Sequence, residues 1–283
     1  MVILKKITFL KEVITQKSAE GHQIGFVPTM GALHEGHITL VEQATKQCSF
    51  VVVSIYINPT QFNNPDDFKK YPITLEQDIL ALTKAGCDAL FLPDTDEIYP
   101  TGTANLELYE LGLIENTLEG RYRPGHFQGV CRVVNRLLAA VNPDYLFLGQ
   151  KDAQQCKVIA KMLQLTNRSV QLVIVPTIRA TSGLALSSRN KRLSEEGLIK
   201  AAALYETLLF VQENIEIGNN DGLIETAKTR LLSAGFEAVD YIAIADHSNL
   251  ADASHWDGKT TVYILGAAFI EGVRLIDNTI FVG

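Results

Sequence analysis

Short apolar runs rich in β-branched and aromatic residues alternate with helical patterns along the first 177 residues. The clearest run is 50–58, FVVVSIYIN, which lacks a regular polar alternation and is typical of a strand buried on both faces. Strands of this kind belong to parallel sheets whose two faces are both covered by helices. The pattern therefore predicts an α/β fold with right-handed crossovers. Strands are expected at 24–29, 50–58, 88–93, 144–152 and 171–176, and helices at 36–49, 74–86, 126–143 and 153–166.

The pattern changes at residue 177. Residues 177–194, TIRATSGLALSSRNKRLS, are polar and predict a linker or a functional loop. After them, helices are expected at 195–214 and 221–235, followed by strands at 238–246, 259–270 and 272–282. Helices followed by sequential strands are typical of an α+β domain. We therefore expect a Rossmann-like parallel-sheet domain at 1–177 and a smaller α+β domain at 178–283.

The composition excludes several classes of protein. Of the 283 residues, 47% are hydrophobic and 20% charged, which is ordinary for a soluble globular protein. The formal net charge is −7 and no long basic tract occurs, which argues against nucleic acid as a partner. No apolar run approaches the ~20 residues that span a bilayer, and the first residues are too charged for a signal peptide. We expect a cytoplasmic protein without a membrane partner. Its cysteines form no CxxC pair and are expected to be reduced structural thiols: Cys48, Cys87, Cys131 and Cys156.

The segment 28–37, PTMGALHEGH, lies where the first expected strand gives way to a helix. In open parallel sheets, ligands bind at the carboxyl ends of the strands. A helix N-terminus there offers unpaired N–H groups and a partial positive charge, which suit a phosphate. His34 and His37 lie three residues apart, on one side of the first helical turn, and both can donate hydrogen bonds to phosphate oxygens. Gly31 and Gly36 allow a ligand to approach the backbone closely.

Two other interpretations of this segment remain open at this point. One is a metal site made by His34, Glu35 and His37, although the spacing is not HExxH and no third ligand is evident. The other is a tight turn with two surface histidines. Other phosphate-binding or hydrolase motifs, GxxxxGK[ST], GxGxxG after the first strand and GxSxG, are absent. An HxGH element at the first strand–helix junction is similar to that of the nucleotidylyltransferase superfamily and of class I aminoacyl-tRNA synthetases, which use it to hold the phosphates of ATP.

Further segments narrow this similarity from a superfamily to a single family. They are 26–37 (FVPTMGALHEGH), 56–72 (YINPTQFNNPDDFKKYP), 119–138 (EGRYRPGHFQGVCRVVNRLL), 143–155 (PDYLFLGQKDAQQ), 185–194 (ALSSRNKRLS) and 274–278 (RLIDN). With them the chain resembles the pantothenate synthetase (pantoate–β-alanine ligase) family over its whole length. One small departure is Gln150, where the family usually has Glu before the Lys-Asp pair.

The resemblance implies an enzyme of pantothenate biosynthesis. The pantoate carboxylate attacks the α-phosphorus of ATP to give pantoyl-adenylate and pyrophosphate, and the amine of β-alanine then displaces AMP. The resemblance also implies Mg²⁺ and a homodimer. Attack on a polyanion depends on charge neutralisation and in-line positioning, which matches the cations and hydrogen-bond donors of these segments. The HxGH element alone leaves two alternatives open, a nucleotidylyltransferase that keeps the adenylate in its product and a non-catalytic nucleotide-binding module.

The resemblance assigns catalytic roles to four residues. Lys151 reaches the α- and β-phosphates, Arg189 neutralises the departing pyrophosphate, and His37 donates a proton toward the phosphates with support from His34. By pattern alone, Lys151 is also compatible with a solvated turn and Arg189 with a basic linker. The implied ATP-binding residues are Met30, Gly31, Ala32, Leu33, His34, Glu35, Gly36, His37, Gly149, Gln150, Lys151, Asp152, Ile178, Leu186, Ser187, Ser188 and Arg189.

The family uses Gln61 and Gln155 for pantoate, with Gln61 also near β-alanine. A neutral amide binds hydroxyl and carboxylate oxygens without trapping the anion as tightly as arginine does, although glutamines are also common on surface loops. Asp152 either caps the following helix or contacts the nucleotide or its Mg²⁺. The segment 64–67, NPDD, is compatible with a metal cluster but favours a solvated helix start. The turn 121–127, RYRPGHF, is compatible with an active site or a subunit interface.

Overall fold

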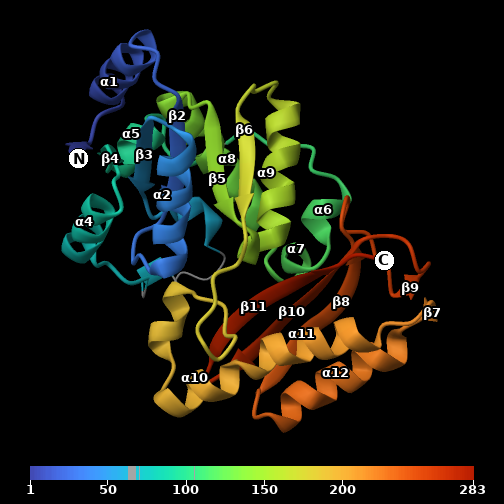
Figure 1. Ribbon diagram of the computed structural model, residues 1–283. Coiled ribbons are helices and arrows are strands. Elements are labelled where there is room, and N and C mark those ends of the chain that lie inside the picture. The colour runs from blue at the N-terminus through green and yellow to red at the C-terminus, as the bar shows by residue number, and fades with distance from the viewer. Residues whose placement is uncertain (63–67, 70, 105) are drawn as a thin grey trace. The chain divides into compact units, whose positions relative to one another are not determined.

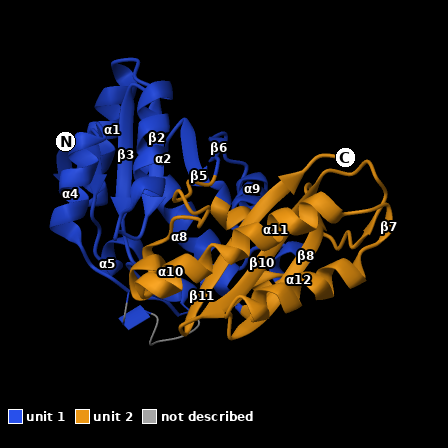
Figure 2. Cartoon of the chain, turned by 60° about the horizontal axis from the view of Figure 1, so that its bottom comes forward, with its two compact units in different colours: residues 1–115, 123–150, 155–176 blue, residues 116–122, 151–154, 177–283 orange. Residues whose placement is uncertain are grey.

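The structure, a computed structural model, describes residues 1–62, 68–69, 71–104 and 106–283 (Figure 1). The segment 64–67 therefore lies outside the described residues. The chain divides into two compact units, unit 1 with residues 1–115, 123–150 and 155–176, and unit 2 with residues 116–122, 151–154 and 177–283 (Figure 2). The chain passes into unit 2 for the last time at Thr177. Unit 2 also takes two short segments from the first 177 residues, which the sequence analysis did not separate.

Unit 1 contains a six-stranded parallel sheet in the order β1-β4-β3-β2-β5-β6 (Figure 1). Its strands are β1 (Val2–Leu4), β2 (Ile24–Thr29), β3 (Phe50–Ile55), β4 (Ala89–Phe91), β5 (Tyr145–Gly149) and β6 (Gln171–Val175). The Rossmann-like parallel sheet is thus confirmed, with β1 as an unexpected edge strand. From β2 the chain proceeds through β3 to β4 and then returns to the other side of β2 with β5. The direction of strand addition therefore changes between β2 and β5, which is the position where open α/β sheets bind ligands.

Helices cover both faces of this sheet. Those wholly or mostly in unit 1 are α1 (Ile7–Ala19), α2 (Glu35–Gln47), α4 (Leu75–Lys84), α5 (Thr95–Ile98), α6 (Leu113–Asn116), α8 (His126–Val141) and α9 (Ala153–Leu165). Val52 packs in a cluster with α1, α8 and α9, whereas Val51 and Val53 pack in a second cluster with α2 and α4. All three valines are fully buried, as the apolar run predicts. Helix α1 was not expected. Its buried residues are Leu10 and Ile14, and Ile7 and Val13 pack against the same core.

Unit 2 contains a three-stranded antiparallel sheet in the order β11-β10-β8. Its elements are α7 (Glu119–Tyr122), α10 (Glu195–Ala201), α11 (Ala203–Asn214), β7 (Gly218–Asn219), α12 (Asp221–Ser233), β8 (Ala238–Asp246), β9 (His255–Trp256), β10 (Val262–Ile270) and β11 (Val273–Phe281). Apolar residues of α11 and α12, such as Leu208 and Leu231, share one core with Ile264 of β10 (Figure 1). The predicted α+β unit is therefore present. The single helix expected at 195–214 is interrupted at Ala202, whose N–H bonds to Ile199 in a tightened turn.

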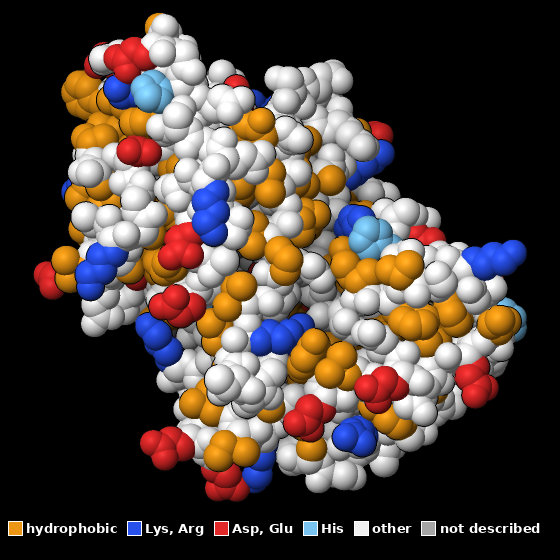
Figure 3. All heavy atoms as spheres, in the orientation of Figure 1, with side chains coloured by type: hydrophobic (Ala, Val, Ile, Leu, Met, Phe, Trp, Pro, Cys, Tyr) orange, Lys and Arg blue, Asp and Glu red, His pale blue; other side chains and the backbone are white. Residues whose placement is uncertain are grey.

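Surface and cysteine features agree with the composition. Among the described residues, no helix is both long enough and apolar enough to cross a membrane. On the face seen in Figure 3, Lys and Arg side chains are scattered among Asp and Glu side chains rather than gathered in one large patch. All four cysteines are buried, and burial raises the pKa of Cys87 and of Cys131 to about 12. These thiols are therefore poor nucleophiles.

Gly129 provides a test of the packing between α8 and the turn that carries Gln61. A Cβ atom at Gly129 would lie 2.2 Å from the carbonyl oxygen of Thr60 and 2.7 Å from the Cα of Gln61. Because both neighbours are backbone atoms, we expect Gly129→Ala to destabilise the protein by about 1–3 kcal/mol and to lower its Tm in thermal unfolding followed by circular dichroism. Gly222→Ala in α12 is the control, since a Cβ there meets no atom within 4 Å. Equal melting temperatures for the two variants would contradict this packing.

Candidate active site

A buried carboxylate shapes the turn that follows β2. Gly31 and Ala32 have φ angles of +80° and +51°, so two successive residues adopt the left-handed conformation. The N–H groups of Ala32 and Leu33 each donate to a different oxygen of Asp78 on α4, both at 2.9 Å. Asp78 is 3% exposed and also accepts a hydrogen bond from the Thr74 hydroxyl. Backbone N–H groups in such a turn form an anion-binding nest, and here the protein's own carboxylate occupies it.

Gly31 is required in this turn for two reasons. Its φ angle is unfavourable for residues with a Cβ atom. A Cβ atom would also lie 3.0 Å from Ile55 and 3.2 Å from the Asp78 carboxylate. The turn thus depends on the glycine as well as on the carboxylate beneath it.

His34 and His37 cap the start of α2 reciprocally. The N–H of Gly36 donates to Nδ1 of His34 at 3.2 Å, and the N–H of His34 donates to Nδ1 of His37 at 3.4 Å. The ring centroids are 4.1 Å apart. The structure therefore brings the two histidines together on the first turn, as their spacing predicts. Glu35, the first residue of α2, is exposed beside them.

These caps determine which ring nitrogen carries the proton. A backbone N–H can only donate, so the Nδ1 atoms of His34 and His37 must both be unprotonated acceptors. In a neutral imidazole the proton then lies on Nε2. The backbone N–H groups of His37 and Ile38 bond to the carbonyl of His34. The N–H groups of Gly36, His37 and Ile38 thus have partners within this turn.

Gln61 lies on η1 (Pro59–Gln61), just after β3, and its amide is oriented by neighbours. Its Oε1 accepts from Nδ2 of Asn58 at 3.1 Å, and its Nε2 donates to the sulfur of Met30 at 3.0 Å. Asn58 is fully buried, and its own Oδ1 accepts from the Tyr99 hydroxyl at 2.9 Å. Gln61 and Met30, both predicted site residues, are thus in contact. Asn58 was missed, although it stands in the INPTQF segment that drew attention to Gln61.

The turn 121–127 is divided between the units. His126, which is 6% exposed and belongs to unit 1, places Nδ1 2.8 Å from the carbonyl oxygen of Gln61. Residues up to Tyr122 belong to unit 2. One end of this turn, His126, therefore supports the segment that carries Gln61. The sequence left both an active site and a subunit interface open for this turn.

The end of β5 and the start of α9 hold the remaining predicted residues of unit 1. The carbonyl of Gly149 accepts a weak hydrogen bond from the Cys156 thiol at 3.4 Å. Gln150 begins the short helix η2 (Gln150–Asp152), along which the chain passes from unit 1 to unit 2. Gln155 lies in the first turn of α9 and is half-buried.

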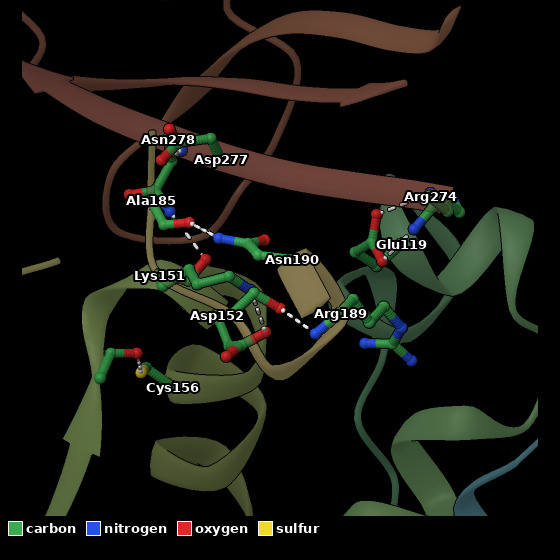
Figure 4. A network of polar contacts seen from close by, with 12 residues as sticks. Glu119, Lys151, Asp152, Cys156, Ala185, Arg189, Asn190, Arg274, Asp277 and Asn278 are labelled. Carbon is green, nitrogen blue, oxygen red and sulfur yellow. Dashed lines mark hydrogen bonds and ion pairs between the residues drawn. The ribbon is translucent and has the colours of Figure 1, made fainter. Parts of the chain in front are cut away.

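In unit 2, Lys151 and Asp152 stand on η2 with their side chains 3.6 Å apart, Nζ to Oδ1. The carbonyl of Lys151 accepts a hydrogen bond from Nδ2 of Asn278 on β11 at 2.9 Å (Figure 4). The Lys151 side chain is 18% exposed. Because the bond to Asn278 uses the main chain, it does not occupy the ammonium group.

The predicted residues of the polar loop lie together in unit 2. Ile178 and Leu186 are paired, since the N–H of Leu186 donates to the carbonyl of Ile178 at 2.9 Å. Ser187 then caps η3 (Ser188–Arg192) by accepting from the N–H of Arg189 at 3.3 Å. Nδ2 of Asn190 holds the carbonyl of Ala185 at 3.0 Å (Figure 4). The loop is therefore an ordered hairpin followed by a capped turn rather than a plain linker.

A buried ion-pair network in unit 2 was not predicted from the sequence. Arg274 on β11 donates to both carboxylate oxygens of Glu119, at 2.7 and 2.8 Å, and to Asp240 at 2.7 Å. The Tyr241 hydroxyl donates to Glu119 at 2.9 Å, and burial together with this carboxylate raises the Tyr241 pKa well above its ordinary value. The N–H of Glu119 in turn donates to Oε1 of Gln154 at 2.9 Å. The motif segments 119–138 and 274–278 are thus partly structural partners of each other.

The described residues contain no group of three or more His, Cys, Asp or Glu side chains that could hold a metal ion. His34, Glu35 and His37 therefore do not form such a group. The two histidines instead cap the start of α2.

Comparisons with known proteins agree over the whole chain. The family model described as pantoate-beta-alanine ligase matches residues 2–280. The chain is 40% identical to the pantothenate synthetase of Cytophaga hutchinsonii over 285 residues, covering 100% of both chains. It is 44% identical to that of Ectopseudomonas mendocina over 280 residues, covering 98% of this chain and 97% of the relative.

Solved structures give the same result. The crystal structure of pantothenate synthetase from Thermus thermophilus matches with a TM-score of 0.85 at 38% identity, covering 99% of each chain. The pantoate-beta-alanine ligase from Francisella tularensis, complexed with beta-gamma ATP and beta-alanine, matches with a TM-score of 0.81 at 38% identity, covering 99% of this chain and 97% of that one.

Asp78 gives a structural prediction for the turn after β2. Asp78→Asn keeps the shape of the side chain but turns an amide donor toward the N–H of Ala32 or Leu33. One buried N–H then loses its acceptor, so we expect a loss of about 1–3 kcal/mol in the free energy of unfolding, measured with urea. Glu76→Gln, an exposed residue of the same helical turn, removes the same charge and is the control. If Asp78→Asn is no less stable than Glu76→Gln, the carboxylate does not hold the turn.

Proposed function

Because the chain belongs to the pantoate-beta-alanine ligase family, we propose that it condenses pantoate with β-alanine through a pantoyl-adenylate. The family reaction itself, condensation of pantoate with β-alanine using ATP, is the activity of this enzyme. We propose the pantoyl-adenylate route and the roles of individual residues in it. The observation that carries it is the reciprocal His34–His37 cap after the carboxyl end of β2, together with the contact of the Gln61 amide with Met30 of the same turn.

The proposed route has two steps. A carboxylate oxygen of pantoate attacks the α-phosphorus of ATP, a P–O bond forms, and the bond to the β-phosphate breaks to release pyrophosphate. The amine of β-alanine then attacks the acyl carbonyl of the adenylate, loses a proton, and displaces AMP. Neither step needs a protein nucleophile, so catalysis depends on positioning and on stabilising negative charge.

In unit 1, His34 and His37 donate Nε2–H hydrogen bonds to phosphate oxygens in this proposal. Since the caps hold both Nδ1 atoms as acceptors, the histidines act as neutral donors. Transfer of the Nε2 proton itself would need Nδ1 to gain a proton and the cap to break. A preorganised donor of this kind contributes about 10²–10³ in rate. The remaining residues of the turn, from Met30 to Gly36, form the backbone against which the nucleotide packs.

Gln61 and Gln155 bind pantoate in the proposal. Asn58 orients the Gln61 amide so that Nε2 points to Met30, and a thioether sulfur is only a weak acceptor. A hydroxyl or carboxylate oxygen of the substrate can therefore take over this donor at small cost. This supports Gln61 as a donor to pantoate.

In unit 2, we assign phosphate binding to Lys151, Ser187, Ser188 and Arg189, with Ile178 and Leu186 packing on the nucleotide. Lysine and arginine supply the positive charge that a developing pyrophosphate requires. The ordered hairpin and the Ser187 cap support this assignment, because they hold the serine and arginine residues on one short turn.

Mg²⁺, a homodimer and a cytoplasmic location complete the proposal. Mg²⁺ is usually held by one or two carboxylates together with substrate phosphates, and the exposed carboxylate of Asp152, beside Lys151, fits such binding. When bound, the ion neutralises phosphate charge. The homodimer and the location rest on the family resemblance and the composition, and size-exclusion chromatography with light scattering tests the former.

Isotope exchange between pyrophosphate and ATP tests the route. We expect exchange that depends on pantoate and proceeds without β-alanine, because the first step is reversible and complete in itself. Exchange driven by a mononucleotide would indicate instead an enzyme that retains the adenylate in its product. Exchange without any added acid, or none until β-alanine is present, would also contradict the acyl-adenylate route.

Two substitutions of His37 separate its ring nitrogens. Asn places a polar atom near Nδ1 and Gln near Nε2, so His37→Asn keeps the cap and His37→Gln keeps the donor. We expect His37→Asn to lose about 10²–10³ in exchange rate, as does His37→Ala, while all three retain their circular-dichroism spectra. His37→Gln should recover part of the loss. Greater activity in His37→Asn than in His37→Gln would show that the cap, rather than the Nε2 donor, is what the reaction needs.

A further inference from the structure

The segment 151–154 is held by unit 2, although β5 before it and most of α9 after it belong to unit 1. At its start, the Lys151 carbonyl accepts the hydrogen bond from Asn278. At its end, the Gln154 side chain bonds to the N–H of Glu119 at 2.9 Å and to the carbonyl of Thr117 at 2.8 Å. Both ends of this short segment are therefore tied to other parts of unit 2.

Both ties lead to β11. Asn278 is itself a β11 residue and is 2% exposed. Glu119 is bound bidentately by Arg274, four residues earlier on the same strand. β11 is paired with β10 along its whole length, residues 273–281, so it is a firm support for the Lys151 backbone (Figure 4).

Asp277, next to Asn278, supports the second segment that carries an assigned cation. This segment is the loop that leads to Arg189, and the first is 151–154 with Lys151. Its carboxylate, 4% exposed, receives two hydrogen bonds from Arg179, at 2.5 and 3.0 Å. Arg179 also donates to the carbonyl of Asn278 at 3.1 Å and lies over the ring of Tyr205, 3.4 Å from its centroid. The guanidinium is thus fixed on both its edge and its face.

Arg179 belongs to the hairpin that ends at Leu186 and leads directly into Ser187. It is bridged to Ala185 across this hairpin and donates to the carbonyl of Gly183 at 3.2 Å. Fixing Arg179 therefore fixes the base from which the turn of Ser188 and Arg189 starts. The N–H of Asn278 donates to Asp277 at 2.7 Å, so the two supports are also bonded to each other.

We propose that the neighbouring residues Asp277 and Asn278 of β11 are positioning residues, Asn278 for Lys151 and Asp277, through Arg179, for the Ser187–Arg189 turn. The proposal rests on the function assigned above to Lys151 and Arg189. Neither Asp277 nor Asn278 touches the reacting atoms in it. Their adjacency on one strand keeps the spacing of the two cation-bearing segments constant within unit 2.

A double-mutant cycle tests the Asn278 arm. Asn278→Ala removes the donor to the Lys151 carbonyl, and we expect a loss of about 10- to 100-fold in the maximal rate of pantoate-dependent exchange. Lys151→Ala should lose about 10²–10³-fold. In the Lys151→Ala background, Asn278→Ala should lower the exchange rate by less than about twofold, because the side chain that Asn278 positions is already absent. Thr279→Val is the control, since it removes a hydrogen bond from the next residue of β11, to Gln212, and should leave the rate within about twofold.

The outcomes separate the positioning role from the proposed function. Equal fold-losses from Asn278→Ala in both backgrounds would overturn the positioning role while leaving the function intact. No exchange in the wild-type protein would overturn the adenylate route instead, and full exchange in Lys151→Ala would overturn the role assigned to Lys151. If Asn278→Ala fails to fold by circular dichroism, Asn278→Ser, which keeps a polar group in the strand but is too short to reach Lys151, replaces it in the cycle.

Discussion

The central strands of unit 1 are buried on both faces, and this constraint determines where chemistry can take place. Val51, Val52 and Val53 are fully buried, so the sheet has no polar face on which a substrate could lie. Polar groups are tolerated only where strands end and backbone N–H groups need partners. The strand order changes between β2 and β5, and the polar segments after β2 and β3 are built at that end of the sheet.

Those segments depend in turn on buried polar side chains. Asp78 satisfies the N–H groups of the turn after β2, and Asn58 orients the amide of Gln61. Each is almost fully buried and fully engaged, which is the condition under which a buried polar group confers rigidity rather than strain. The turn after β2 and the Gln61 amide are thus held in place by buried side chains.

The sequence predicted the parallel sheet, the α+β unit and the strand–helix junction, because these depend on local apolar periodicity. The His34–His37 pair was also predictable, because three residues always span one side of a helical turn. Asp78 and Asn278 were not, since each acts through a partner far along the chain and nothing in the local pattern distinguishes them from surface residues. That residues 151–154 belong to unit 2 has the same origin, because it depends on contacts with residues far along the chain, such as the hydrogen bond from Asn278 to Lys151. The segment 274–278, RLIDN, was singled out only by its resemblance to the family. The structure shows what it does, because Arg274, Asp277 and Asn278 bond to Glu119, Arg179 and Lys151.

With the roles proposed above, the two units contribute different kinds of group. The donors assigned in unit 1 are two imidazoles and the amides of Gln61 and Gln155, whereas the cations Lys151 and Arg189 both belong to unit 2. This division suits a reaction in which a carboxylate must remain nucleophilic while a polyphosphate leaves. A neutral amide holds the carboxylate without stabilising its charge as an ammonium or guanidinium group would, and the positive charge is reserved for the pyrophosphate. In the role proposed for Gln61, replacing it by arginine would therefore strengthen ground-state binding of pantoate at the expense of its attack on ATP. The buried Asn58, which orients the Gln61 amide, supports a neutral group at this position.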